Sequence, residues 1–448
     1  MAPMIGLLLG AVLCLGWESS AGAAGDAGLI DEIQRRAFLY FLDHAEPHTG
    51  LVRDRASNFG EESRTVASTA ATGFALASMP VGVERGWVSR AKAASYCERC
   101  LEYLVRVAPS EHGFFYHFMD MRTGERAWRC EVSSIDTALL LAGALTAGSY
   151  FGGRTNALAQ VLLGRADFGW MLTDGGSQPN SLTLCHGWTP EAGFLPSRWD
   201  TYAEQSILYL LAMGSPTHPI PPQCWDAVQR PIGEYAGLKT FFGGPLFIHQ
   251  YSHAFVDFRG KVDRMGFDYW QASVNATLAN RRFCIDQAER FRGYGPDCWG
   301  LSASDCVDGY HAHGAPPGWA GHDGTIAPYP ALASVPFAPR HCIALARHLR
   351  RSHADKLWGR YGFSSAFNVS RNWWSKDVVG IDLGCAVLMI ENYRTGLVWK
   401  LCSRVEALSR GLRAAGFRPL PVRKPITYSS EIWVQSRPAS RTQSGCHP

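Results

Sequence analysis

Apolar positions along most of the chain recur every three to four residues, which is the period of an α-helix. Residues 29–43 illustrate the pattern, with Ile33, Ala37 and Phe41 on one predicted helical face. Similar segments cover residues 63–78, 86–107, 132–149, 154–171, 199–213, 269–291, 339–350, 380–393 and 397–415. Only residues 245–253 have the character of a short β-strand. The pattern predicts an all-α protein with ten or more consecutive helices and little β structure.

A bundle of this many helices would need one very large core, whereas a closed ring of helical hairpins buries the same surface in layers. No repeat of 20 to 50 residues is visible, which argues against an open solenoid. The chain also lacks a linker rich in Pro, Ser or Gly. We therefore expect one α/α toroid, with long loops at residues 173–198 and 291–339.

The first residues have the pattern of an export signal. Residues 5–17 form an apolar run, and Ala21-Gly22-Ala23 offers a small-residue cleavage site. No other apolar run is long enough to span a bilayer. We expect a signal peptide at 1–23, a catalytic domain at 24–435 and a disordered tail at 436–448, in a monomer exported to the periplasm or secreted.

Composition narrows the classes of partner. Hydrophobic residues make up 46% of the chain and charged residues 18%, which favours a large packed core over disorder. The net charge of +4 comes with no basic block, so nucleic-acid binding has no support. Many of the 15 Trp fall in loops rich in Gly and Pro. Such rings either stack on the apolar faces of sugars or cap the core.

The chain has 13 cysteines. In an exported protein some would pair, and Cys298 with Cys306, which flank one loop, is the first disulfide to test. Cys97 and Cys100 form a lone CxxC inside a predicted helix. Without a second CxxC, buried thiols are favoured over a zinc or redox site.

Carboxylates mark the start of two predicted helices. Glu131 and Asp136 precede the apolar run at residues 138–141, and either cap the helix or face a cleft. Asp200 and Glu204 are four residues apart and would share a helical face. Aromatic neighbours would desolvate Glu204 and raise its pKa, as a general acid requires. The alternative for Glu204 is a solvated acid in a first helical turn.

A third helix start carries Trp374 and Asp382, the latter close to two glycines that allow a ligand near the backbone. Further along the same helix, Glu391 is interpreted as a structural ion pair with Arg394 or another Arg. In a separate loop, Arg55 and Asn58 could hold substrate hydroxyls or take part in internal salt bridges.

The loop at residues 299–330 contains Asp305, His311, His313 and Asp323. A metal site is one interpretation of this loop, but His-Ala-His spacing alone is a weak signal, and a sugar-binding loop is favoured. No nucleophile elbow, P-loop or dinucleotide fingerprint is present, so we expect neither metal nor cofactor.

Several motifs in order resemble the bacterial glucoamylase-like family, which includes endo-β-1,2-glucanases and the processing domain of cyclic β-1,2-glucan synthases. The matching stretches lie at residues 55–65, 113–118, 131–141, 299–305, 323–328, 380–384 and 390–399. The resemblance extends from about residue 29 to residue 401. It implies an α/α six-hairpin barrel and an enzyme that hydrolyses a β-glucan, most simply a β-1,2-glucan.

The resemblance also implies roles for particular residues. Glu204 matches the general acid of an inverting hydrolase, and Asp136 and Asp382 match acids of the cleft, with Asp382 on the side of the base. We further expect a set of substrate-binding residues: Glu131, Arg55, Asn58, Trp199, Tyr202, Asp305 and Trp374. The extra cysteines, including Cys130 and Cys185, depart from the family pattern, which leaves the width of the cleft, and endo or exo action, open.

Three alternatives remain open at this point. The protein could be a transglycosylase on β-1,2-glucan rather than a hydrolase, as some members of the resembled family are. A polysaccharide lyase on a similar toroid would use Tyr202, His253 or His311 to abstract a proton. A glycan-binding protein could keep the barrel without turnover, although acids at three helix starts argue against it.

Overall fold

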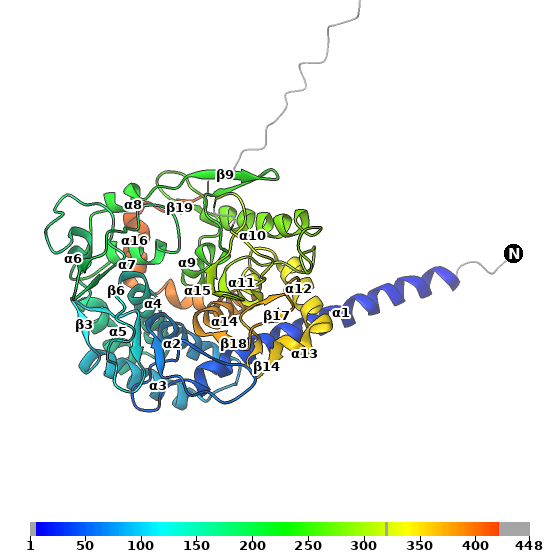
Figure 1. Ribbon diagram of the computed structural model, residues 1–448, viewed down its shortest axis with the longest axis horizontal. Helices are drawn as coiled ribbons and strands as arrows, with labels where there is room; N and C mark the ends of the chain where they lie inside the picture. The colour runs from blue at the N-terminus through cyan, green and yellow to red at the C-terminus, as the bar shows by residue number, and fades with distance from the viewer. Residues whose placement is uncertain (1–5, 319–320, 421–448) are drawn as a thin grey trace, which may run out of the picture.

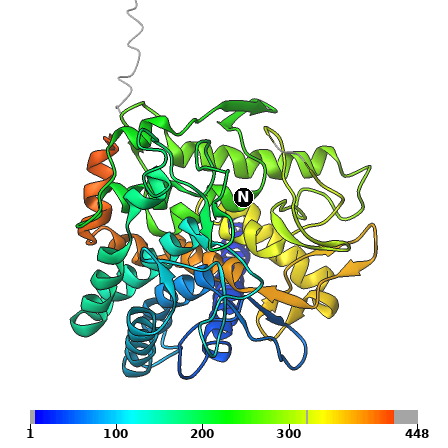
Figure 2. The ribbon, with the colours of Figure 1, turned by 60° about the vertical axis from the view of Figure 1, so that its left-hand side comes forward.

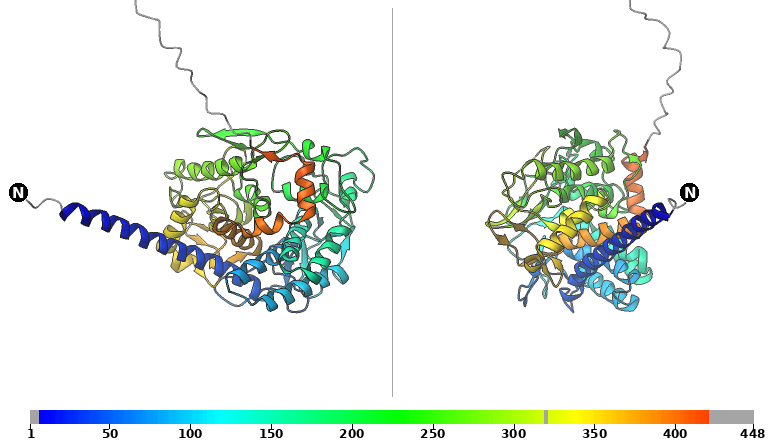
Figure 3. Two further views of the ribbon diagram at one scale, coloured as in Figure 1. Left: turned by 180° about the vertical axis from the view of Figure 1, so that it is seen from behind. Right: turned by 90° about the vertical axis from the view of Figure 1, so that its right-hand side faces the viewer.

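The computed structural model describes residues 6–318 and 321–420 (Figure 1). The expected tail at 436–448 and the first five residues of the expected signal peptide lie outside the described residues. Residues 6–23 belong to the backbone of α1 (Gly6–Asp43), whose N-terminal part extends away from the body (Figures 1 and 3). Among the described residues, no helix combines the length and apolarity needed to cross a bilayer.

Six helices of the described chain form a closed inner ring. They are α2 (Thr69–Glu84), α4 (Ser134–Phe151), α7 (Ser206–Met213), α9 (Tyr251–Phe255), α11 (Pro328–Ala333) and α14 (Gly380–Arg394). Each contacts the next in this order, with the 3-10 turn η1 (Leu246–His249) between α9 and α11, and α14 returns to α2. These helices are buried on nearly every side. Their sequences accordingly show little polar periodicity, as expected for helices without a solvent face.

An outer layer covers this ring. It consists of α1, α3 (Arg90–Arg106), α5 (Gly153–Arg165), α10 (Tyr269–Asp286), α12 (Pro339–Ser352) and α16 (Glu406–Ala414). In α12 the buried residues are Cys342, Leu345, Ala346 and Leu349, while its arginines face outward, so this helix is amphipathic. α16 (red) and α12 (yellow) lie on opposite sides of the body in Figures 1 and 2. The predicted α/α six-hairpin toroid is confirmed.

Shorter elements connect the two layers. The remaining helices are α6 (Phe168–Thr173), α8 (Gln223–Ala227), α13 (Ala354–Leu357) and α15 (Leu397–Cys402). The paired strands are β1 (Arg55–Ser57) with β18 (Asp377–Val379), β2 (Val66–Ser68) with β5 (Phe118–Asp120), β3 (Ser110–Glu111) with β4 (Phe114–Phe115), β9 (Ile232–Tyr235) with β10 (Leu238–Phe241), β11 (Lys261–Val262) with β19 (Arg418–Pro419), β12 (Ala303–Cys306) with β13 (Gly309–Ala312), β14 (Trp358–Gly359) with β15 (Gly362–Phe363), and β16 (Phe367–Asn368) with β17 (Trp373–Trp374). A three-stranded sheet joins β6 (Val132–Ser133), β7 (Gly187–Thr189) and β8 (Gly193–Phe194). All these pairs are antiparallel.

The strands β2, β6 and β18 lead directly into the inner helices α2, α4 and α14. The N-terminal ends of the inner helices therefore carry the loops and ribbons of one rim. Glycines let the ring close tightly below this rim. A Cβ atom on Gly73 of α2 would lie 2.5 Å from the carbonyl oxygen of Leu139 in α4, and one on Gly143 would collide with the backbone of Gly73. Close packing of α2 on α4 fixes the two helix starts relative to each other.

Two predicted elements differ from the structure. The segment at 199–213 becomes helical only at Ser206, because residues before it form turns in which Tyr202 N–H donates to the carbonyl of Gln229 at 2.8 Å. Asp200 and Glu204 therefore share no helical face. Residues 245–253 form η1 and α9 rather than a strand, since a short apolar run does not distinguish a buried helix from a strand.

The cysteines from Cys97 to Cys402 are free thiols, so Cys298 and Cys306, the first pair to test for a disulfide, are not joined. Cys298 lies in a tight turn closed by its bridge to Gly295, whereas Cys306 ends β12. Cys97 and Cys100 are buried thiols in α3, as predicted.

Candidate active site

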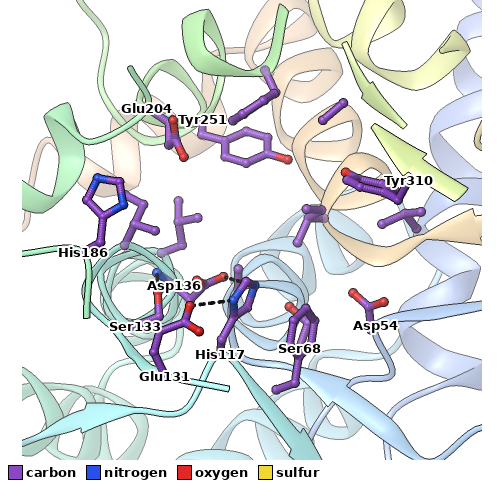
Figure 4. A pocket seen from close by; sticks show the side chains of 18 of the residues that line it. Asp54, Ser68, His117, Glu131, Ser133, Asp136, His186, Glu204, Tyr251 and Tyr310 are labelled. Atoms are coloured by element: carbon purple, nitrogen blue, oxygen red, sulfur yellow. Dashed lines mark hydrogen bonds and ion pairs between the residues drawn. The ribbon is translucent and has the colours of Figure 1, made fainter. Parts of the chain in front are cut away.

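A cavity of about 570 Å³ lies where the inner helices begin (Figure 4). Its wall includes Ser68, which caps α2, Asp136 in the first turn of α4, and Ile381 in the first turn of α14. Glu204, two residues before α7, and Tyr251, the first residue of α9, complete the circle. The ring of helix starts thus brings residues from distant parts of the chain to one cavity.

A histidine joins two carboxylates on one wall. His117 Nδ1 lies 3.0 Å from Oε1 of Glu131, and its Nε2 lies 3.6 Å from Oδ1 of Asp136. Burial alone would lower the pKa of His117, but the charge of Asp136 and the hydrogen bond and charge of Glu131 raise it to about 9. The same hydrogen bond lowers the pKa of Glu131. At neutral pH His117 is therefore an imidazolium that lies beside the ionised Glu131 and within 3.6 Å of Asp136.

Asp136 both closes the helix start and faces the cavity. Its backbone N–H donates to Oγ of Ser133 at 3.2 Å, and the Ser133 hydroxyl donates to Oδ2 of Asp136 at 2.5 Å. This reciprocal arrangement is the local reason for a short polar residue three positions before the acid. The carboxylate is consequently fixed in direction, and the two interpretations of Asp136 made from the sequence hold together.

Glu204 occupies the opposite wall (Figure 4). Among the described residues it takes part in no ion pair, while its backbone carbonyl accepts a hydrogen bond from Ser252 Oγ at 2.6 Å. Burial raises the pKa of Glu204 to about 7, and the negative charge of Asp136 acts in the same direction. Glu204 therefore keeps its proton up to neutral pH, while the pKa of Glu131 on the facing wall is lowered.

Asp382 lies behind the cavity wall. Its side chain is 4% exposed, it is not among the residues that line the cavity, and its Oδ2 has no hydrogen-bond partner among the described residues. Burial raises its pKa to about 8, with a further contribution from the charge of Asp305, while Arg55 opposes the shift. Burial raises the pKa of Tyr251, which lines the cavity, and the charges of Asp382 and Glu204 raise it further.

Arg55 connects the cavity to this second layer. Its guanidinium contacts Asp305 at 2.8 Å and Asp54 at 3.1 Å, and lies 5.6 Å from the centre of the Tyr310 ring. Asp305 also accepts a hydrogen bond from Ser375 Oγ at 3.0 Å. Of these groups Asp54, Arg55 and Tyr310 line the cavity, and Asp305 positions Arg55 from behind.

Besides Asp305, three predicted substrate-binding residues have internal partners instead. Asn58 is buried, its amide donates to the carbonyl of Gly362 at 3.0 Å, and its Oδ1 accepts from Tyr361 N–H at 2.9 Å. Tyr202 packs in an aromatic cluster with Phe241 and Tyr269. Trp374 stacks on Phe367 with ring centres 5.2 Å apart. None of the three lines the cavity.

Trp199, in contrast, is part of the cavity wall. Its indole N–H donates to Ser134 Oγ at 3.0 Å, and His186 stacks on its ring with centres 3.8 Å apart. Burial lowers the pKa of His186. Trp199, Glu131 and Arg55 are thus the predicted binding residues that the fold brings into the cavity alongside Asp136 and Glu204.

Several cavity residues were not singled out from the sequence: Asp54, His117, Phe118, Trp128, His186, Tyr251 and Tyr310. His117 and Phe118 do fall in one of the family-like motifs, which was the available signal. No group of three or more potential metal ligands occurs in the described part of the chain. The cavity thus places the protonated carboxyl of Glu204 opposite the carboxyl groups of Asp136 and Glu131, and aromatic side chains line its sides.

Several known proteins resemble this chain in sequence and in structure. A family model described as "Putative glucoamylase" matches residues 196–406. The structure superposes on an endo-β-1,2-glucanase from Chitinophaga pinensis, crystallised with sophorotriose and glucose, with a TM-score of 0.79 and 30% identity, covering 88% of this chain and 98% of that one. A "putative glucoamylase" from Bacteroides uniformis gives a TM-score of 0.80 at 32% identity over 88% of this chain and 98% of that chain.

A curated relative from Parabacteroides distasonis is an exo β-1,2-glucooligosaccharide sophorohydrolase acting at the non-reducing end. It is 29% identical over 429 residues, which is 87% of this chain, and this chain spans 58% of that relative's length. The agreement in sequence along nearly whole chains, together with the shared toroid, shows that this protein belongs to the bacterial glucoamylase-like family.

Proposed function

We propose that this protein is a glycoside hydrolase that cleaves β-1,2-linked glucan or its oligosaccharides. The observation that carries the proposal is the position of Glu204, a carboxyl with a pKa of about 7 that faces Asp136 across the cavity. Glycoside hydrolysis needs an acid that is protonated near neutral pH and a second carboxylate that is not. Two relatives named for action on β-1,2-linked glucose chains support the choice of substrate.

In the proposed mechanism Glu204 donates its proton to the oxygen of the departing sugar. A carboxylate on the other side of the scissile bond activates a water molecule, which attacks the anomeric carbon and inverts its configuration. Trp199 and Tyr310 offer flat apolar surface for the sugar rings, and Arg55 offers donors to their hydroxyls. In this mechanism two carboxyl groups and the attacking water supply the chemistry.

Two carboxyl groups are candidates for the general base. Asp382 is the choice from the family resemblance, but with a pKa of about 8 it must lose a proton before it can act at neutral pH. Asp136 lines the cavity directly and is oriented by Ser133 and His117. We propose that Asp136 activates the water molecule. Asp382 then acts indirectly, through its electrostatic interactions with Arg55 and Tyr251.

A panel of linear β-1,2-, β-1,3-, β-1,4- and α-1,4-glucans tests the proposal, with products sized and their anomeric form followed by NMR. We expect reducing ends only from the β-1,2 polymer or its oligosaccharides, and an α-anomer as first product. Cleavage confined to another linkage would overturn the substrate, and products longer than the substrate would indicate transglycosylation.

A lyase receives little support from the same geometry. Tyr202 and His253 are buried outside the cavity, with His253 Nε2 3.0 Å from Ser273 Oγ, and His311 lies on the exposed strand β13. A new absorbance from a carbon–carbon double bond in the product would favour the lyase nevertheless.

The localisation of the protein remains a prediction from residues 1–23. We propose export, and mass spectrometry of the mature protein recovered from outside the cytoplasm tests it. A mature chain that begins close to residue 24 is the expected result, and an uncleaved cytoplasmic chain would contradict it.

A further inference from the structure

One aromatic side chain at the cavity is out of keeping with a structural role. Trp128 is 67% exposed, the highest value among the large apolar side chains of the described residues, and it lines the cavity. Leaving two thirds of a Trp exposed forgoes most of the burial that usually retains this residue in a fold. Its place at a sugar-sized cavity therefore calls for a ligand rather than a packing explanation.

The turn that presents Trp128 is held in an unfavourable backbone conformation. Both Trp128 and Arg129 have φ of 52°, in the left-handed region that residues other than Gly, Asn and Asp rarely adopt. The guanidinium of Arg126 donates to the carbonyl oxygens of Arg129 and Cys130, and also contacts Glu191 at 2.7 and 3.0 Å. The Arg126 side chain thus binds the turn through Arg129 and Cys130 and is itself held by Glu191. Without these contacts the strained backbone of the turn would relax.

The indole of Trp128 ends a row of three neighbouring rings that starts at His117. The His117 and Phe118 rings stack with centres 3.9 Å apart and an interplanar angle of 15°. Phe118 and Trp128 follow at 5.0 Å and 57°. Since His117 contacts Glu131 and Asp136, the row leads from the carboxylates outward to solvent.

We propose that Trp128 is a stacking platform for an outer glucose unit of the glucan chain, beyond the units held between Glu204 and Asp136. The inference rests on the proposed function and adds to it a subsite on the Glu131 side of the cavity. An indole face binds the apolar face of a pyranose without regard to the hydroxyl pattern. Trp128 therefore contributes to binding only when the chain is long enough to reach it.

The test compares Trp128→Ala with a matched control, Phe59→Ala. Phe59 is 45% exposed, lies in another loop and is not part of the cavity. KM and kcat are measured on β-1,2-gluco-oligosaccharides of increasing length. For Trp128→Ala we expect KM to rise about five- to tenfold on the longer chains, with kcat and the shortest cleaved substrate changed less than about twofold. Trp128→Tyr should restore most of the loss.

Two further measurements separate a binding role from a structural one. The melting temperature of Trp128→Ala should equal that of the parent, because an exposed indole buries little surface. Arg126→Lys loses the fork that anchors the turn and should raise KM for long chains while Trp128 is intact. If Trp128→Ala behaves as Phe59→Ala does, or lowers kcat/KM equally at all lengths, the platform is refuted although hydrolysis stands. If the parent cleaves no β-glucan, the proposed function fails and the inference fails with it.

Discussion

Acidic side chains on the two walls of the cavity have pKa values shifted in opposite directions. On one wall, His117 lies between Glu131 and Asp136 and compensates their charge, and the pKa of Glu131 is lowered. On the other wall, Glu204 has no ionic partner among the described residues, and burial raises its pKa to about 7. Similar carboxyl groups thus have different proton affinities because of what surrounds them. The difference supports the proposed roles, in which Glu204 donates the proton and the wall of Glu131 and Asp136 acts from the other side.

A third acid shows that burial alone does not create this difference. Glu391 is 1% exposed, deeper than Glu204, yet Arg85 contacts both of its oxygens at 2.8 and 2.9 Å. Gln34 and Thr395 donate to it as well. A buried acid with a full set of partners serves the fold, which confirms the interpretation of Glu391 as a structural ion pair with Arg394 or another Arg, here Arg85.

The largest effect is expected from Glu204→Gln. The amide keeps the size of the side chain but has no proton to give, so kcat should fall by on the order of 10²–10⁴-fold. Stability should be retained or increase, because a buried ionisable group without an ionic partner is removed. Steady-state kinetics on β-1,2-glucan and thermal unfolding measure both quantities. Full activity in this variant would refute the assignment of the acid.

Glu391→Gln is the matched control for that experiment. It removes one charge of a buried ion pair, which should cost roughly 3 kcal/mol of folding free energy. Because Glu391 lies outside the cavity, kcat of the folded fraction should be unchanged. A loss of kcat in both variants would erase the distinction between the two acids.

The next largest effect separates the two candidate bases. Asp136→Asn removes the carboxylate at the cavity wall, and we expect kcat to fall about a hundredfold or more. Asp382→Asn changes a group in the layer behind, and a loss of about tenfold is expected through the position of its neighbours. Kinetics of both variants on one substrate give the order. A deeper loss in Asp382→Asn would return the base to the residue that the family resemblance indicates.

Sequence reasoning reached part of this site and missed the rest for physical reasons. The toroid was predictable because inner helices are uniformly apolar and outer helices such as α12 are amphipathic. Asp136 and Glu204 were recognisable as acids next to apolar runs. Their different environments were not, because the pKa of Glu131 depends on its hydrogen bond to His117, and Glu204 lies in turns fixed by the contact of Tyr202 with Gln229.

The errors have the same origin. A helix placed from residue 199 ignored the bridge between Thr201 and Gln229, a contact over 28 residues that local periodicity does not contain. Asn58 looked available for substrate, but its partners Tyr361 and Gly362 lie some 300 residues away in sequence. Trp128 had no distinguishing pattern, since its exposure results from the Arg126 anchor.

The pH dependence gives a smaller but direct test of the two walls. A general acid must be protonated, so kcat/KM should fall about tenfold per pH unit above the pKa of Glu204, which is about 7. The charge of Asp136 contributes to that raised pKa, so Asp136→Asn should move this limb of its residual activity to lower pH. A profile that stays flat from pH 6 to 9 would contradict the protonation state assigned to Glu204.

The smallest effect concerns stability at Asp382. Its pKa is about 8 in the folded protein against 3.8 for an ordinary Asp, so folding favours its protonated form. The contribution is fully present below about pH 4 and is lost progressively as pH rises to about 8. Asp382→Asn has no such loss, and its melting temperature should exceed that of the parent by about 2 °C or more at pH 8.5, with a smaller difference at pH 5. Differential scanning calorimetry at both pH values measures it, with Asp200→Asn, an exposed acid, as control. An equal shift at both pH values would mean that Arg55 already neutralises Asp382 in the folded state, and that the layer behind the cavity resembles the His117 wall rather than the Glu204 wall.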